Sequence, residues 1–99
     1  MLPRKTHLEM ASALRLVKSV LSDHENVRHT YVCLTIDHLV RCRKIKIEIS
    51  DHLQKWIVLQ LDGDFSTVKT WATEQGIYLD DYQAYRKAWI DHMIKILES

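Results

Sequence analysis

The sequence predicts an all-α fold, a compact bundle of about five helices. The chain of 99 residues contains only two glycines and one proline, whereas β-sandwiches and barrels need turn residues at every corner. Apolar residues recur every three or four positions over most of the chain, which is the spacing of amphipathic helices. Hydrophobic residues make up 46% and charged residues 27%, values typical of globular proteins. We therefore expect residues 1–99 to form a single helical domain.

The first helix is expected over residues 8–21, and a second over residues 31–41. Thr6 and Glu9 have the spacing of a capping box, which would place the start of the first helix just after Thr6. Each segment carries one apolar stripe. The stripe residues are Met10, Ala13, Leu14, Val17, Val20 and Leu21 in the first, and Val32, Cys33, Ile36, Leu39 and Val40 in the second.

Residues 44–50 fit two different structures. Ile45, Ile47 and Ile49 alternate with polar residues, as in a half-buried strand. The same segment also begins a stripe with a step of four, made of Ile45, Ile49, Leu53, Ile57 and Leu61. A lone strand would have no partner, so a helix is favoured, ended by Gly63 in the left-handed conformation.

Two further helices complete the predicted bundle. A short one over residues 67–75 follows a capping Ser66 and ends in a Schellman motif at Gly76 and Ile77. The last helix follows a capping signal that begins at Asp80. Its apolar stripe is Tyr82, Tyr85, Ala88, Trp89, His92, Met93, Ile96 and Leu97. The predicted core of the whole bundle includes Leu14, Val17, Ile36, Leu53, Ile57, Trp71, Trp89 and Ile96.

Charge is nearly balanced over the chain but not along it. The net charge is +1 overall, with +4 on residues 1–50 and −3 on residues 51–99. A nearly neutral protein has no global field that would attract it to nucleic acid or to a membrane. Opposite charges on the two halves suit contacts between copies, and the apolar content exceeds what one small core hides. We therefore expect a homo-oligomer.

The sequence also indicates a compartment. No apolar run reaches about 18 residues, and the N-terminal residues lack the pattern of a signal peptide. We therefore expect a cytoplasmic protein with no membrane partner. Cys33 and Cys42 are expected to be reduced and buried, with a disulfide between them as the less favoured alternative.

Catalytic and metal chemistry find little support in the residues. The six histidines include no pair four residues apart, and there is no Cys-x-x-Cys, so neither a metal nor a cofactor is expected. No nucleophile elbow is present, and burial would make the thiol of Cys33 inert. The short helix offers too few cations to read a DNA sequence. We expect a protein that is not an enzyme, with no catalytic residues and no sequence-specific DNA binding.

Two features are candidates for binding. The first is a dense basic run between the second and third helices, made of Arg41, Arg43, Lys44 and Lys46. It has the composition either of a solvated connection at a helix C-terminus or of a site for phosphates or an acidic partner. The second is His92, which lies on the apolar stripe of the last helix. It would be either a core residue with satisfied ring nitrogens or part of a pocket between subunits.

Residues 31–37 read Tyr-Val-Cys-Leu-Thr-Ile-Asp. They resemble an aromatic-x-Cys-x-Ala-Ile-Asp pattern of a family of small proteins from tailed bacteriophages. Residues 65–71 and 81–92 are similar to the Ser-Thr-x-x-x-Trp-Leu and Tyr-Arg-x-x-Trp-Leu ending of the same proteins, except that Ala72 stands where leucine is usual. The resemblance covers about the last two thirds of the chain. It implies a phage origin but brings no activity with it.

The resemblance also frames the expected function. It implies a small interaction protein that inhibits a host factor or an antiviral defence system in the cytoplasm of an infected bacterium. The alternatives are an oligomeric sponge for a nucleotide immune signal and an accessory of phage structure or assembly. If the basic run and a histidine lined the same concavity, this would favour sequestration of a nucleotide signal over inhibition of a protein.

Overall fold

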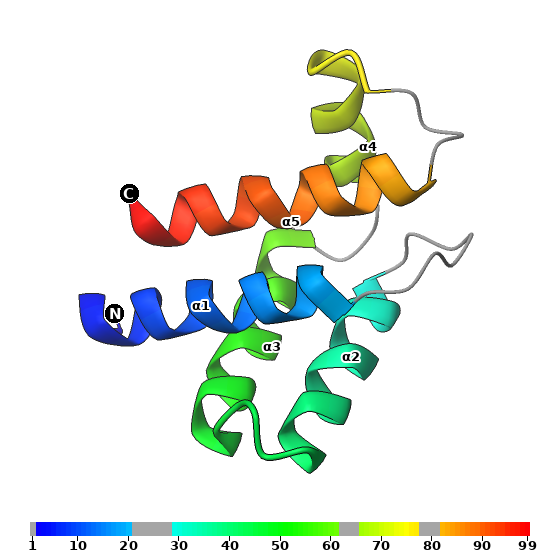
Figure 1. The fold of residues 1–99 in the computed structure, drawn as a ribbon. Helices are drawn as coiled ribbons and strands as arrows, with labels where there is room; N and C mark the ends of the chain where they lie inside the picture. Colours follow the sequence, from blue (N-terminus) through cyan, green and yellow to red (C-terminus); the bar gives the residue numbers. More distant parts are fainter. Residues whose placement is uncertain (1, 21–28, 62–65, 78–81) are drawn as a thin grey trace.

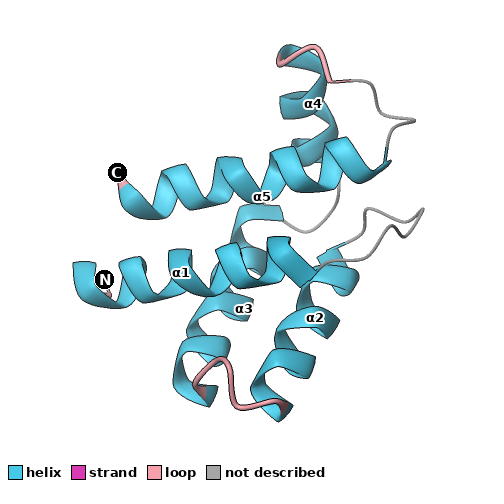
Figure 2. Cartoon of the chain, viewed as in Figure 1, coloured by secondary structure: helices cyan, strands magenta, loops and turns pink. Residues whose placement is uncertain are grey.

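Five helices form the structure in the parts of the chain described by the computed structural model, residues 2–20, 29–61, 66–77 and 82–99 (Figures 1 and 2). They are α1 (Arg4–Val20), α2 (His29–Arg41), α3 (Ile47–Leu61), α4 (Ser66–Glu74) and α5 (Tyr82–Glu98). These parts contain no strand, and the predicted all-α bundle is confirmed. The radius of gyration is 12.9 Å, as expected for a folded chain of about 100 residues.

The helix α1 lies at the centre of the arrangement. It runs antiparallel to α5, its most extensive neighbour, and it also packs against α2 and α3 (Figure 1). The helices α2 and α3 form a hairpin below α1, and α4 packs against α3 and α5. The termini of the chain therefore lie at the same end of the molecule.

Most of the predicted core is confirmed. Six of its residues are buried: Leu14, Val17, Ile36, Leu53, Ile57 and Trp89. Trp71 is half-buried and packs against this core. The prediction is wrong for Ile96, which is 41% exposed. Because α5 packs against both α1 and α4, its buried surface takes in Ile90 and Ile94, which the predicted stripe omitted, and Ile96 falls outside it.

The start of α1 differs from the prediction. The carbonyl oxygen of Pro3 accepts the first helical hydrogen bond, from the backbone N–H of His7 at 3.1 Å. Thr6 and Glu9 therefore lie within the helix, and the predicted capping box is wrong. The proline ring fixes φ near the helical value, and the helix begins at Arg4, two residues before the expected cap at Thr6.

The helix α2 ends in a Schellman motif with an arginine in the position that glycine usually occupies. Arg43 has a φ of 59°. The backbone N–H of Lys44 donates to the carbonyl of Leu39 at 2.9 Å, and that of Arg43 donates to Val40 at 2.9 Å. This bond pair defines the motif. A left-handed residue other than glycine costs about 1–2 kcal/mol.

The predicted Schellman motif at the end of α4 is confirmed. Gly76 has a φ of 71°, and the backbone N–H of Ile77 donates to the carbonyl of Ala72 at 2.9 Å. A Cβ at Gly76 would meet no atom within 4 Å. The backbone conformation alone therefore favours glycine here.

The helical alternative holds for the segment around Ile47, but the helix begins later than expected. The carbonyl of Lys46 accepts from the backbone N–H of Ser50 at 3.0 Å, so residues 44–46 are a connection and the strand alternative is wrong. Ile45 lies in this connection and its side chain is buried in the core, whereas Ile47 is 65% exposed.

Several predictions fall on residues or side chains outside the described part of the structure. They concern Leu21, Leu61, Gly63, Ser66, Asp80, Tyr82 and Tyr85.

Trp89→Ala should lower the free energy of unfolding by about 3–5 kcal/mol, because the buried indole leaves a cavity. Urea denaturation followed by circular dichroism measures this loss. Ile96→Ala on the same helix is the matched control and should cost at most about 1 kcal/mol. Equal losses at the two positions would contradict the packing of α5 described above.

Arg43→Gly should raise the free energy of unfolding by about 0.5–1 kcal/mol, because the relief of left-handed strain exceeds the added entropy of the unfolded chain. Arg41→Gly, two residues earlier and inside the last turn of α2, should instead destabilise by up to about 1 kcal/mol. Thermal unfolding of the two variants distinguishes these signs. A loss of stability in Arg43→Gly would mean that its side chain holds the connection in place.

Candidate functional site

The basic run separates into two pairs in the structure. All four of its side chains are exposed. Lys44 and Lys46 line a groove between α1 and the beginning of α3, whereas Arg41 and Arg43 are not among the residues that line it. The left-handed Arg43 turns the chain between α2 and α3, and the residues that follow it line the groove together with residues of α1.

This concavity, the α1–α3 groove, has a volume of about 440 Å³, which is within the range of ligand-binding sites. Its lining is mainly aliphatic. Its apolar lining residues are Leu8, Ala13 and Leu16 from α1, together with Ile45 and Ile49 from the connection and α3. Leu8 and Leu16 each remain more than a third exposed.

The edge of the α1–α3 groove is positively charged. Lys5 from the first turn of α1 joins Lys44 and Lys46, and Glu9 is the one carboxylate among the lining residues. None of the three lysines forms an ion pair with any residue that the structure describes. Sequence reasoning missed Lys5, because about 40 residues separate it from the basic run and only the packing of α1 against α3 brings them together.

His92 lies elsewhere in the molecule. Its half-buried ring stacks on Trp71 of α4, with ring centroids 4.5 Å apart and an interplanar angle of 27°. Burial, assisted by Lys95, lowers the pKa of His92. Figure 1 places α4 and the α2–α3 connection at opposite ends of the molecule. The structure therefore does not bring His92 to the basic run.

The two cysteines differ in environment, and both are free thiols. Burial, assisted by Asp37, raises the pKa of the half-buried Cys33. Cys42 is exposed, so its predicted burial is wrong. It lies in the turn directly after α2, and its Sγ lies 3.6 Å from Nε2 of His38.

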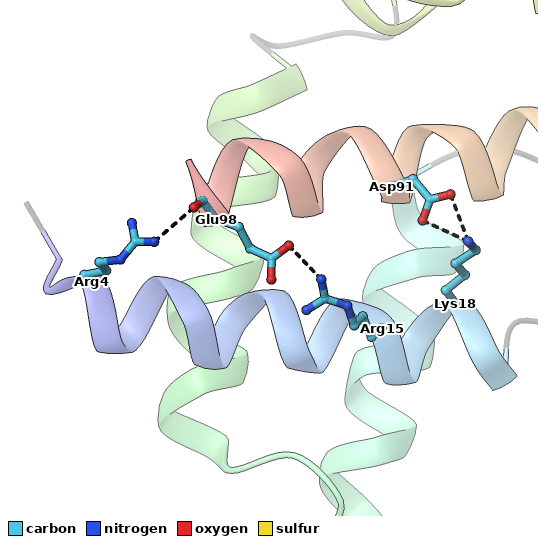
Figure 3. Close-up of polar contacts among 5 residues, drawn as sticks. All are labelled: Arg4, Arg15, Lys18, Asp91 and Glu98. Atoms are coloured by element: carbon cyan, nitrogen blue, oxygen red, sulfur yellow. Dashed lines mark hydrogen bonds and ion pairs between the residues drawn. The ribbon is translucent and has the colours of Figure 1, made fainter.

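A second groove, of about 750 Å³, lies between α1 and α5 and is crossed by ion pairs (Figure 3). Arg15 contacts Glu98 at 2.6 Å, and Lys18 contacts Asp91 at 2.8 Å. Arg4 donates to the backbone carbonyl of Glu98 at 3.2 Å. The hydrogen bond from Arg15 lowers the pKa of Glu98. These contacts link the two helices at their exposed edge. The carboxylates of Glu98 and Asp91 are each neutralised by a cation of α1.

Two further observations concern the described residues only. They contain no group of three or more His, Cys, Asp or Glu side chains that could hold a metal ion. None of the helices has both the length and the apolar character that a membrane span needs.

The stability of the protein should fall as pH drops through the titration of His92. The pKa of His92 is lowered in the folded protein, so between this value and the ordinary value of about 6.5 the unfolded chain binds more protons. The neutral form of His92 therefore contributes to the free energy of unfolding above this pH window, and this contribution is lost as the pH falls through it. His92→Gln removes the titrating group, so the loss of melting temperature between neutral and mildly acidic pH should be smaller in the variant. Equal losses in both proteins would contradict this assignment.

Comparisons with protein-family models, curated protein sequences and solved structures gave no match for this chain. The phage resemblance stays a prediction from the motifs in residues 31–37, 65–71 and 81–92, and the geometry of the α1–α3 groove is the basis for a functional proposal.

Proposed function

We propose that this protein acts by binding an acidic segment of another protein in the α1–α3 groove. The observation that carries the proposal is an aliphatic lining with three lysines at its edge, Lys5, Lys44 and Lys46, none of which has an ion-pair partner among the described residues. Aliphatic contact provides affinity, whereas charge at an edge speeds association and selects the sign of the partner.

The chemistry of the lining favours a protein over a nucleotide signal. Nucleobases are held mainly by stacking on aromatic or arginine planes. The lining residues of the α1–α3 groove are aliphatic side chains, a serine, a glutamate and lysines. Such a surface is complementary to leucine, isoleucine or valine side chains flanked by carboxylates. His92, the residue that the sponge hypothesis needed beside the basic run, stacks on Trp71 instead.

The kind of partner follows from the resemblance to phage proteins. On that basis, the partner is a host factor or a component of an antiviral defence system, and binding inhibits it by occupying its surface. The groove itself requires only that the partner exposes apolar and acidic side chains together.

The double variant Lys44→Glu/Lys46→Glu should weaken binding of an acidic apolar peptide by at least about tenfold, since like charges then face each other. The probe is a fluorescein-labelled peptide of leucines flanked by glutamates, measured by fluorescence anisotropy. A second peptide, with lysines in place of the glutamates, should not bind the unmodified protein.

Lys55→Glu is the matched control, because Lys55 is exposed on α3 and is not among the residues that line the groove. This variant should retain binding, and higher salt should weaken binding to the unmodified protein. Unchanged affinity in the double variant would overturn the proposal, as would equal loss in Lys55→Glu.

A further inference from the structure

The face that α1 presents to the α1–α3 groove has the spacing of a surface that receives another helix. Two sets of four residues, at positions i, i+3, i+4 and i+7, lie next to each other along it. They are Lys5, Leu8, Glu9 and Ser12, followed by Glu9, Ser12, Ala13 and Leu16. Four residues at this spacing form the hole that accepts one side chain from a facing helix.

The two holes are suited to two side chains of one partner. They are four residues apart along α1, or about 6 Å at the helical rise. Ser12 and Ala13 are small, so a partner backbone can approach closely, whereas Leu8 and Leu16 flank them and remain partly exposed. Ile49 of α3 lines the same groove and so provides a wall across from the holes.

A helix fits this surface better than an extended segment does. The backbone groups of α1 are bonded within the helix itself, so the aliphatic lining has few partners for a second backbone. An extended peptide would leave its own N–H and C=O groups unsatisfied on this lining, at a cost in free energy. A helix satisfies its backbone internally and presents only side chains.

We infer that the occupant of the α1–α3 groove is an amphipathic α-helix of the partner protein. Its two aliphatic side chains lie one turn apart and insert into the two holes of α1. Its carboxylates face Lys5 on one side and Lys44 and Lys46 on the other, and a neutral or basic side chain faces Glu9. This inference rests on the proposed function and specifies the structure of the bound segment.

Two fluorescein-labelled peptides of identical composition test the inference. Both contain two leucines, glutamates and alanines, and they differ only in whether the leucines are four or two positions apart. The peptide with a spacing of four should bind at least about tenfold more tightly, because only it presents both leucines on one helical face. Its helical circular dichroism signal should also increase on binding.

Ser12→Leu tests the holes without changing any charge. Ser12 belongs to both holes and is exposed, and leucine is a good helix former, so the variant should fold and fill the space that the peptide needs. Binding of the peptide with a spacing of four should weaken by at least about tenfold when these anchors are excluded. Ser19→Leu is the control, on the same helix and outside the α1–α3 groove, and should leave binding unchanged.

The outcomes separate this inference from the proposed function. If both peptides bind equally and both lose affinity in Lys44→Glu/Lys46→Glu, acidic binding stands and the helical inference is overturned. If Ser12→Leu binds as tightly as the unmodified protein, the two holes are not the site, and the inference is again overturned. If neither peptide binds the unmodified protein, both proposals fail.

Discussion

The antiparallel packing of α1 along α5 is the contact on which the other elements depend. It is the most extensive contact between helices in the described structure, and α1 also packs against α2 and α3. Buried side chains from both helices, among them Met10, Leu14, Ile90 and Met93, form the middle of the core. At the exposed edge, the ion pairs of Arg15 with Glu98 and Lys18 with Asp91 hold the same two helices together. Because exposed ion pairs contribute little free energy, burial supplies most of the stability of this contact.

The same packing determines where positive charge remains available. Arg15 and Lys18 are paired to carboxylates of α5. Lys5 of α1 and Lys44 and Lys46 of the α2–α3 connection have no ion-pair partner among the described residues. Lys5, Lys44 and Lys46 therefore provide a local positive field in a protein whose net charge is only +1. A local field of this kind guides an acidic partner to one surface, although the whole molecule attracts neither sign strongly.

The left-handed residue Arg43 connects the local backbone to the site. It ends α2 and brings Ile45 into the core, and with it the neighbouring lysines to the edge of α1. Strained residues often lie at functional sites, and Arg43 directly precedes Lys44, one of the three lysines of the groove. The strain is confined to this turn, because the two backbone hydrogen bonds of the Schellman motif fix Arg43 and Lys44 to the last turn of α2.

The sequence by itself determined the helical class and most of the buried stripes, because helical periodicity is a local property of neighbouring residues. Leu14, Leu53 and Trp89 could be assigned to the core in this way. The sequence could not show that Ile94 is buried and Ile96 exposed, because the buried face of α5 depends on which helices pack against it. It also could not bring Lys5 and Leu8 to Lys44 and Lys46, nor separate His92 from them. Only the tertiary structure decided these relations, since a groove between helices depends on contacts between residues far apart in the chain.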